Sequence, residues 1–328
     1  MDNFFYKKKV LVTGASGFVG VNLINKLVAL GADVRGTIFE REPPIELPEV
    51  EYLRVDLRKS EDCLRVTEGI DYVFMAAAKS SGAEVIERTP LVHLTPNLVM
   101  NALMLEAAYE NHVKKFCFIS SNVVYPLADF PVTENDVNNE YFEKYFIVGW
   151  MKRFSELMCQ MYAEKIKIPM ETLIIRPGNL YGPYDKFTLQ DSKVIPALIR
   201  RAVERESPLN VWGDGSDIKD FLYIDDFIAG MLLAFQHFSA FQTINIASGI
   251  PISICEVLSS ILNAANFTQA EVVFDVSRPT MIPMRLINID KAIRELNWFP
   301  KIGIHDGIIR TVNWYKNYYA MHTPEEMR

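Results

Sequence analysis

Three glycines near the start of the chain have the spacing of a phosphate-binding loop. Gly14, Gly17 and Gly20 lie in the segment Thr13-Gly-Ala-Ser-Gly-Phe-Val-Gly20, between an apolar run and an amphipathic one. Gly14 permits a tight turn, Gly17 lets the backbone approach a ligand, and Gly20 allows a helix to pack closely on a strand. Since the following helix offers unpaired N–H groups to an anion, the segment predicts a binding site for a dinucleotide pyrophosphate. The alternative is a purely structural turn.

Short runs with strand character alternate with amphipathic runs around this loop. We expect strands at Val10–Thr13, Asp33–Ile38, Tyr52–Val55, Tyr72–Ala76, Lys115–Ser120 and Thr172–Arg176, and helices at Val19–Leu30, Pro96–Asn111, Phe146–Lys167 and Val194–Glu204. Strands alternating with helices favour right-handed crossovers and a parallel sheet. The sequence therefore predicts an α/β fold with a Rossmann-type, doubly wound parallel sheet.

The alternation loosens beyond Pro177, where loops, proline and glycine become frequent. We expect a dinucleotide-binding domain over residues 1–178, to which residues 222–247 return. Residues 179–328 should form a smaller, mixed α/β lobe. Because no linker separates the two parts, they should pack closely.

Composition excludes several classes of function. The 328 residues include 34 Lys and Arg against 41 Asp and Glu, a net charge of −7, which argues against nucleic-acid binding. No apolar run approaches the roughly 18 residues of a membrane span, and the start does not resemble a signal peptide. A cytoplasmic protein without a metal site is expected. The four scattered cysteines are expected to be buried free thiols: Cys63, Cys117, Cys159 and Cys255.

The glycine spacing and the motifs below resemble the extended short-chain dehydrogenase/reductase family, whose members mostly modify nucleotide sugars. The resemblance runs from Val10 to Tyr318. It implies that Asp56 contacts the adenine, that Ala76–Ala78 lies beside the dinucleotide, and that Asn97 helps to hold the nicotinamide side. The expected cofactor-binding residues are Gly14, Ser16, Gly17, Phe18, Val19, Gly20, Glu40, Asp56, Leu57, Ala76, Ala78, Asn97, Lys152 and Pro177.

The segment that should select between NAD and NADP is ambiguous. Relatives specific for NAD carry an acidic residue after the second strand, whereas NADP enzymes carry an arginine there. Here Glu40 would serve NAD, and Arg35 or Arg41 would serve NADP. We predict NAD, and NADP stays open.

Relatives work by hydride transfer, with a tyrosine exchanging a proton with the sugar hydroxyl. A lysine four residues later lowers the pKa of that tyrosine, and a serine orients the hydroxyl. The segment Ser120-Ser-Asn-Val-Val-Tyr-Pro126 matches the family motif and makes Ser121 the catalytic-type hydroxyl.

The Tyr-x-x-x-Lys motif is altered. If Tyr145 is its tyrosine, Gly149 stands where the lysine belongs. The segment Val148-Gly-Trp-Met-Lys152 fits the family order better, and it places valine where the tyrosine belongs. Tyr145 would share a face with Val148 on a continuous helix, so its hydroxyl is a candidate replacement. Alternatively, Tyr145 is a packing aromatic, or Lys152 itself is the acid and base.

The second lobe resembles GDP-L-fucose synthases, which implies a GDP-sugar substrate. The expected substrate-binding residues are Lys79, Asn122, Asn179, Lys193, Val194, Trp212, Lys219 and Arg285. Basic residues among them should meet the diphosphate. The epimerising cysteine and histidine of those relatives are Val123 and Lys193 here, which argues against 3,5-epimerisation. Asn122 and Val123 likewise replace the acids of 4,6-dehydratases.

The reaction that these arguments leave is hydride transfer at C4 of the sugar, which a dehydrogenase, a ketoreductase or a 4-epimerase would carry out. Such an enzyme would serve polysaccharide biosynthesis. The alternatives are a non-catalytic dinucleotide sensor or scaffold and an atypical dehydratase. The resemblance also implies a homodimer, in which the helices over Pro96–Asn111 and Phe146–Lys167 form a four-helix bundle.

Overall fold

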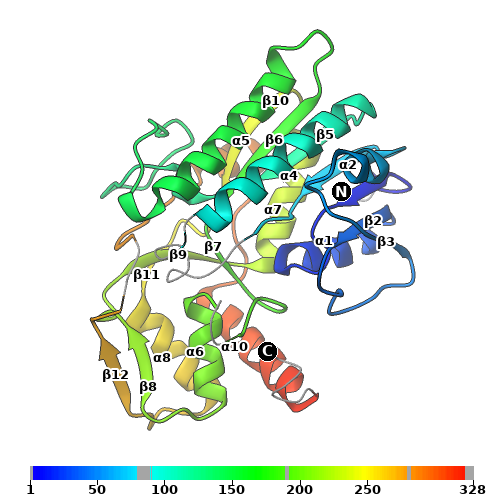
Figure 1. Ribbon diagram of the computed structural model, residues 1–328. Helices are drawn as coiled ribbons and strands as arrows, with labels where there is room; N and C mark the ends of the chain where they lie inside the picture. Colours follow the sequence, from blue (N-terminus) through cyan, green and yellow to red (C-terminus); the bar gives the residue numbers. More distant parts are fainter. Residues whose placement is uncertain (1–2, 80–88, 90, 189–191, 279–281, 322–328) are drawn as a thin grey trace.

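Seven parallel strands form one continuous sheet in the computed structural model, which describes residues 3–79, 89, 91–188, 192–278 and 282–321 (Figure 1). The strand order is β10-β6-β5-β4-β1-β2-β3. The strands are β1 (Lys9–Val12), β2 (Asp33–Ile38), β3 (Val50–Arg54), β4 (Tyr72–Met75), β5 (Lys115–Ile119), β6 (Glu171–Pro177) and β10 (Phe241–Ile246). The order reverses between β1 and β4, so a crevice for a ligand is expected at the carboxyl ends of these strands.

Helices cover both faces of this sheet. One face carries α2 (Ser60–Thr67), α4 (Leu91–Glu110) and α5 (Phe146–Glu164), and the other carries α1 (Phe18–Ala29) and α7 (Ile224–His237). Alternate residues of β1 serve the two faces: Val10 and Val12 pack with α1 and α7, and Leu11 packs with α2 and α4. Since both faces are buried, the central strands β1, β4 and β5 are mostly apolar.

A smaller lobe lies beneath the sheet in Figure 1 and contains most of the chain beyond residue 178. It contains β8 (Leu209–Trp212) paired with β12 (Val272–Asp275), together with α6 (Val194–Val203), α8 (Ile254–Ala265) and α10 (Ile304–Met321). A three-stranded sheet of β7 (Asn179–Tyr181), β9 (Ile218–Tyr223) and β11 (Pro251–Ser253) lies between this lobe and the main sheet (Figure 1). The helix α9 (Asp290–Leu296) contacts α7 and β10.

The predicted fold class is confirmed, one predicted helix start is wrong, and one helix of the dinucleotide-side sheet was not predicted. The helix α4 begins at Leu91 rather than at Pro96, so the proline lies inside it. Proline is favoured in a first helical turn, which is why it predicted a start. The sequence analysis did not place α7, a helix in which nine of the fourteen residues are buried.

The cysteine prediction holds at three positions and is wrong at the fourth. Cys63, Cys117 and Cys159 are buried free thiols, but Cys255 is exposed. It is the second residue of α8, whose inner face buries Ile254 and Val257, and its position on the helix turns it to solvent.

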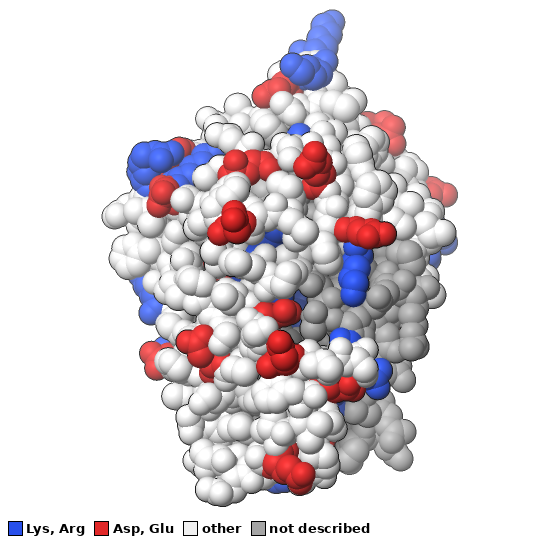
Figure 2. Space-filling model, turned by 90° about the vertical axis from the view of Figure 1, so that its left-hand side faces the viewer, with Lys and Arg blue, Asp and Glu red and all other residues white. Residues whose placement is uncertain are grey.

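The surface carries mixed charge. Figure 2 shows one side of the molecule, on which acidic side chains are scattered among uncharged ones and basic side chains form small groups. None of the helices within the described ranges is long and apolar enough to cross a membrane. Within the same ranges, no group of histidine, cysteine and acidic side chains is arranged to hold a metal ion.

Candidate active site

The glycine loop has the geometry that a phosphate cradle requires. Gly14 has a φ of 71°, and a Cβ atom there would lie 2.9 Å from the Cα atom of Ala77. A Cβ atom on Gly20 would lie 2.1 Å from the carbonyl oxygen of Gly14. Gly17 is the N-cap of α1 and brings no capping side chain, so the first N–H groups of the helix remain available to an anion. The loop therefore fits a dinucleotide pyrophosphate.

A second loop is held against the glycine loop by Thr13. Its Oγ1 atom accepts hydrogen bonds from the N–H groups of Ala76 and Ala77, both at 3.0 Å. Thr13 is fully buried at the end of β1. Our sequence analysis did not assign a role to Thr13, because a threonine that ends a strand gives no separate signal.

Asn97 holds the following part of the same loop from α4. Its Oδ1 atom accepts from the N–H of Lys79 at 2.9 Å, and its Nδ2 atom donates to the Lys79 carbonyl oxygen at 3.0 Å. Asn97 is buried, whereas Ala78 and Lys79 are exposed. Asn97 therefore fixes the backbone at the end of the loop that follows β4.

The contacts of Arg35, near the ends of β2 and β3, bear on the choice between NAD and NADP. Arg35 pairs with Glu51 at 2.7 Å and donates to the carbonyl oxygens of Val66 and Glu68, both at 3.0 Å. These contacts hold its guanidinium on the α2 side, so Arg35 is not available to a 2′-phosphate. Glu40 and Arg41, the other two candidates, are both exposed beyond the end of β2.

Asp56 is held by a neighbouring arginine. Arg58 donates to both carboxylate oxygens of Asp56 at 2.8 Å, and these hydrogen bonds lower the pKa of Asp56. The Arg58 guanidinium also lies 5.3 Å from the ring centre of Phe39. Leu57 between them is buried.

Ser121 and Lys152 lie at the carboxyl end of β5. Ser121 caps the short 3-10 helix η1 (Asn122–Val124), and its Oγ atom accepts from the N–H of Val123 at 3.3 Å. Lys152 on α5 donates from Nζ to the Ile119 carbonyl oxygen at 2.8 Å and lies 4.9 Å from the ring centre of Phe118. Burial lowers the pKa of Lys152 to about 8. The amine therefore titrates close to neutral pH, where a general acid or base is most effective.

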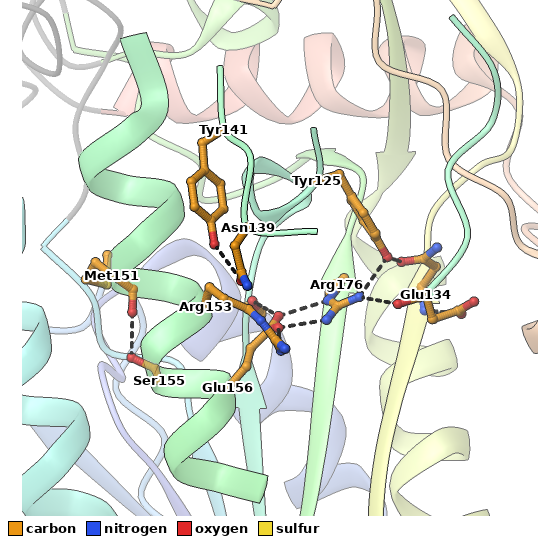
Figure 3. Close-up of polar contacts among 11 residues, drawn as sticks. Tyr125, Glu134, Asn139, Tyr141, Met151, Arg153, Ser155, Glu156 and Arg176 are labelled. Carbon is orange, nitrogen blue, oxygen red and sulfur yellow. Dashed lines mark hydrogen bonds and ion pairs between the residues drawn. The ribbon is translucent and has the colours of Figure 1, made fainter. Parts of the chain in front are cut away.

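Gly149 permits the close packing that brings α5 to η1. A Cβ atom at this position would lie 2.6 Å from a ring carbon of Tyr141 and 3.1 Å from the carbonyl oxygen of Val123. The side chain of Tyr141 is thus held over this turn of α5, and its hydroxyl donates to Asn139 at 3.3 Å (Figure 3).

The predicted helix start at Phe146 is confirmed, and Tyr145 does not lie on a continuous helix with Val148. Tyr145 ends the 3-10 helix η2 (Glu143–Tyr145) and is the N-cap of α5, with φ −105° and ψ 5°. The direction of its side chain is therefore not set by helical spacing from Val148. Burial raises the pKa of Tyr145 to about 12, and the positive charge of Arg285 opposes that rise.

A buried network behind the crevice was not predicted from sequence (Figure 3). Glu156, one turn after Lys152, accepts from the Ser120 hydroxyl at 2.5 Å and from Arg176 at 2.9 and 2.7 Å. Arg176 also donates to the Tyr125 hydroxyl at 3.1 Å. Glu156 and Arg176 have 0% and 3% exposure, so the network is a core feature that fixes α5 against β5 and β6.

Two of the predicted substrate-binding residues hold backbone. Asn122 donates to the carbonyl oxygen of Pro177 at 3.1 Å, and Asn179 donates to that of Asp220 at 3.0 Å. Asp220 is buried and accepts three hydrogen bonds from Ser248 and Gly249. These contacts join β7 and β9 to the end of the main sheet.

The predicted basic residues lie at different depths. Lys219 pairs with Asp217 at 3.0 Å and is partly buried on β9. Arg285, with 2% exposure, donates to the carbonyl oxygens of Pro126 at 2.8 Å and Tyr125 at 3.2 Å. Its backbone N–H donates to the Ile218 carbonyl oxygen, next to Lys219.

The other three candidates belong to the smaller lobe. Lys193 is an exposed N-cap of α6, and Val194 is the first residue of that helix. The Trp212 ring lies 5.4 Å from the guanidinium of Arg278 at the end of β8. The structure thus brings Ser121, Lys152 and the glycine loop to the strand ends, whereas Lys193, Val194 and Trp212 lie on α6 and β8 of the smaller lobe.

Comparisons with known proteins identify a family and relatives over most of the chain. Residues 10–247 match the model of the NAD dependent epimerase/dehydratase family. The chain is 30% identical over 322 residues to "Probable GDP-L-fucose synthase 1" of Oryza sativa subsp. japonica, covering 94% of this chain and 92% of that one. It is 29% identical over 321 residues to "GDP-mannose 3,5-epimerase 1" of the same rice, covering 94% and 82%.

A solved structure is similar over nearly the whole chain. The epimerase Mth375 of Methanothermobacter thermautotrophicus has a TM-score of 0.87 and 27% identity, covering 97% of this chain and 94% of that one. The family resemblance read from the motifs is confirmed. The chain therefore belongs to the NAD-dependent epimerase/dehydratase family and is an enzyme of that family.

Proposed function

We propose that this enzyme transfers hydride at C4 of a GDP-linked sugar, as an oxidoreductase or a 4-epimerase. The observation that carries the proposal is the meeting of Ser121 and Lys152 at the carboxyl end of β5, in a sheet whose glycine loop fits a pyrophosphate. The names of the two rice relatives support a GDP-sugar. Asn122 and Val123 stand where 4,6-dehydratases carry acidic residues. Their presence favours hydride transfer without loss of water.

NAD, when bound, supplies the hydride acceptor. The N–H groups at the start of α1 and the glycine loop bind its pyrophosphate, and Asp56 and Leu57 lie at the adenine. Glu40 serves the adenosine ribose, and Ala76, Ala78 and Pro177 line the nicotinamide end. The proposed cofactor residues are Gly14, Ser16, Gly17, Phe18, Val19, Gly20, Glu40, Asp56, Leu57, Ala76, Ala78, Asn97, Lys152 and Pro177.

The proton of the sugar hydroxyl passes through side chains of this chain. Ser121 has its Oγ lone pair engaged by Val123 N–H, so its own hydrogen is free to be donated to the sugar oxygen. Lys152, with a pKa of about 8, holds the ribose and takes or returns a proton. Tyr145 is the third member of this relay.

The smaller lobe binds the substrate in this proposal, and residues 1–178 with 222–247 bind the dinucleotide. Trp212 stacks near the base, and Lys219 and Arg285 provide positive charge near the diphosphate. The remaining proposed substrate-binding residues are Lys79, Asn122, Asn179, Lys193 and Val194.

A homodimer in the cytoplasm completes the proposal. Four large apolar side chains of α5 are exposed at helical spacing: Phe146, Trp150, Phe154 and Met161, with exposed fractions of 51%, 40%, 50% and 54%. Because exposed apolar stripes favour association, a second copy is the proposed partner, with α4 and α5 of both copies forming a four-helix bundle.

A second candidate is a dinucleotide sensor without turnover. The specific observation in its favour is Val148, which stands where the family tyrosine belongs and offers no exchangeable proton. Such a protein would keep the glycine loop and bind NAD, yet would not oxidise or reduce any sugar.

Absorbance of the reduced nicotinamide separates the two candidates. The purified protein is mixed with GDP-mannose and related GDP-sugars in the presence of NAD or NADP, and the reduced-cofactor band is followed. A sugar-dependent change that is lost in Lys152→Met, while the circular dichroism spectrum is retained, supports the enzyme. Tight NAD binding without a change for any sugar, and without isotope exchange at C4, supports the sensor.

A further inference from the structure

A polar cavity lies beside β10, the edge strand of the main sheet, and it is separate from the candidate active site. Its volume is about 350 Å³, and its lining comes from β6, β10, α5, α9 and the segment 134–137. The lining residues of β10 are 241–243, in the amino-terminal half of the strand. The dinucleotide crevice, in contrast, lies at the carboxyl ends of the strands. None of the described lining residues takes part in the proposed hydride transfer.

Three cationic side chains line this cavity, and each comes from a different element: Arg153 on α5, Arg176 on β6 and Lys291 on α9. Two carboxylates offset them. Glu156 is shared by the two arginines, at 3.1 Å from Arg153 and 2.7 Å from Arg176 (Figure 3). The carboxylate of Glu134, which also lines the cavity, accepts a backbone N–H of β10 at 2.8 Å. Three cations against two carboxylates leave one positive charge in excess.

Arg153 and Lys291 keep hydrogen-bond donors for a ligand. One terminal nitrogen of Arg153 donates to Glu156, and its buried Nε atom has no partner. The Nζ atom of Lys291 donates to the side-chain oxygen of Gln242 at 3.1 Å and to the carbonyl oxygen of Thr243 at 2.7 Å. An ammonium has three hydrogens, so one is left over. Within the described ranges Lys291 forms no ion pair, and neutral oxygens stabilise its charge less than an anion would.

The rest of the lining indicates which anion fits. Asn135, Gln160 and Gln242 contribute primary amides, which both donate and accept hydrogen bonds. The described lining is mostly polar, so it suits hydroxyl groups rather than an aromatic ring or an acyl chain. The volume lies near the lower end of the range of small-molecule sites, about 300–1,000 Å³, so a dinucleotide is too large. A phosphate group, with about 1.5–2 negative charges and three acceptor oxygens, can contact two cations at once.

Arg153 directly follows Lys152, yet the two side chains serve different places. Lys152 donates to the Ile119 carbonyl oxygen at the end of β5, whereas Arg153 lines the cavity beside β10. The neighbouring cations are thus divided between the crevice and the cavity. A ligand in the cavity would not occupy the place of the sugar.

We propose that this cavity is a second ligand site, which binds a phosphate group through Arg153 and Lys291. The phosphate oxygens accept from the N–H groups of Arg153 that Glu156 leaves free and from the third hydrogen of Lys291. The ligand is inorganic phosphate or the phosphate of a sugar phosphate. In a sugar phosphate, the hydroxyl groups contact the amides of Asn135 and Gln160. The inference goes beyond the proposed function and stands without it, because it involves no residue of the proposed reaction.

Calorimetric titration with inorganic phosphate and with glucose 6-phosphate tests the site. NAD is present throughout, so that the glycine loop does not take up the probe. Lys291→Gln and Arg153→Gln should each weaken binding about tenfold or more, because each removes a charge-assisted hydrogen bond. The matched control is Arg294→Gln, which should bind as the wild type does. Arg294 lies on the same helix as Lys291, but it is exposed and pairs with Glu295.

A third variant keeps the test valid if either replacement unfolds the chain. Gln242→Glu has the shape of the amide and places a carboxylate where an oxygen already lies 3.1 Å from Nζ of Lys291. The carboxylate pairs with this ammonium and repels an anion, so phosphate affinity should fall about tenfold or more while Tm is retained. Gln269→Glu is the charge-matched control, because Gln269 is exposed outside the cavity. It should leave the affinity unchanged.

The two probes distinguish the sources of the phosphate. Tighter binding of glucose 6-phosphate identifies a sugar phosphate as the ligand, and equal or weaker binding identifies inorganic phosphate; both results support the site if the three variants lower the affinity. Failure of both probes to bind overturns the proposal. Unchanged affinity in those of the three variants that fold, as judged by circular dichroism, also overturns it. Because binding is measured without a sugar nucleotide, an absence of turnover leaves this result intact.

Discussion

Replacing Glu156 by glutamine should destabilise the fold strongly. The carboxylate accepts four hydrogen bonds, from Ser120 at 2.5 Å, from Arg176 at 2.9 and 2.7 Å, and from Arg153 at 3.1 Å. Glutamine keeps the shape, but its amide nitrogen then faces donors and the Arg176 charge is left uncompensated. Since Glu156 and Arg176 are buried, solvent does not screen the loss.

The magnitude follows from the burial of both partners. Breaking a buried ion pair by removing one partner costs about 3–5 kcal/mol. An unfolding entropy of about 2.1 cal/mol/K per residue gives roughly 1.5 °C for each kcal/mol in a chain of 328 residues, so Tm should fall by roughly 4–7 °C. The change is measured by scanning calorimetry of Glu156→Gln, with Glu164→Gln as the control, since Glu164 lies at the exposed end of the same helix and pairs with Lys165. The control should change Tm by about 1 °C or less.

Two further results complete this test. The double replacement Glu156→Leu with Arg176→Met removes both charges and should recover part of the lost stability, because apolar residues of similar volume replace buried pairs well. Burial lowers the pKa of Lys152, and the negative charge of Glu156 opposes that change. Glu156→Gln should therefore lower the pKa of Lys152 below about 8, which shifts the corresponding limb in the pH dependence of activity. A loss below about 1 kcal/mol in Glu156→Gln would refute the reasoning.

Four other outcomes are expected. Val148→Tyr restores the family phenol and should raise the rate of hydride transfer about tenfold or more, measured by nicotinamide absorbance. Gly20→Ala should abolish NAD binding in calorimetric titration while the chain stays folded, since the new Cβ atom would lie 2.1 Å from a carbonyl oxygen in the phosphate loop. Burial raises the pKa of Asp220 to about 6, so this group favours the folded state fully below pH 4, and that contribution is lost as pH rises from about 4 to 6. The free energy of unfolding should therefore fall over this window by about 3 kcal/mol in the wild type relative to Asp220→Asn. Trp150→Glu should convert the dimer to a monomer in light scattering, and an unchanged mass would contradict the proposed bundle.

Local features of the chain predicted most of the dinucleotide half. The glycine spacing, the strand before it and the helix after it are contiguous, and the backbone conformation that they require is set by residue type. The same holds for Ser121, which follows directly on β5. The alternation of strands and helices then restricts the topology to a right-handed, doubly wound sheet.

Helical spacing could not predict the placement of Tyr145. The predicted helix start at Phe146 is confirmed, but Tyr145, which was considered to share a helical face with Val148, lies outside the helix as its N-cap. The conformation of a residue just before a helix depends on capping and on packing against η1, and neither is visible in a pattern of apolar residues. The exposure of Cys255 was missed for a similar reason, because an apolar neighbourhood in sequence does not say which face of α8 is buried.

The sequence by itself determined the fold class and the family, because both depend on residue types at short, regular spacing such as the three glycines after the first strand. The tertiary structure alone decided which charges meet. Glu156 and Arg176 come from α5 and β6, and Arg285 reaches the residues after η1 from 159 and 160 positions further along the chain. Contacts over such separations depend on how helices and sheets pack. The interaction between buried charges depends both on these contacts and on the exclusion of water from the site.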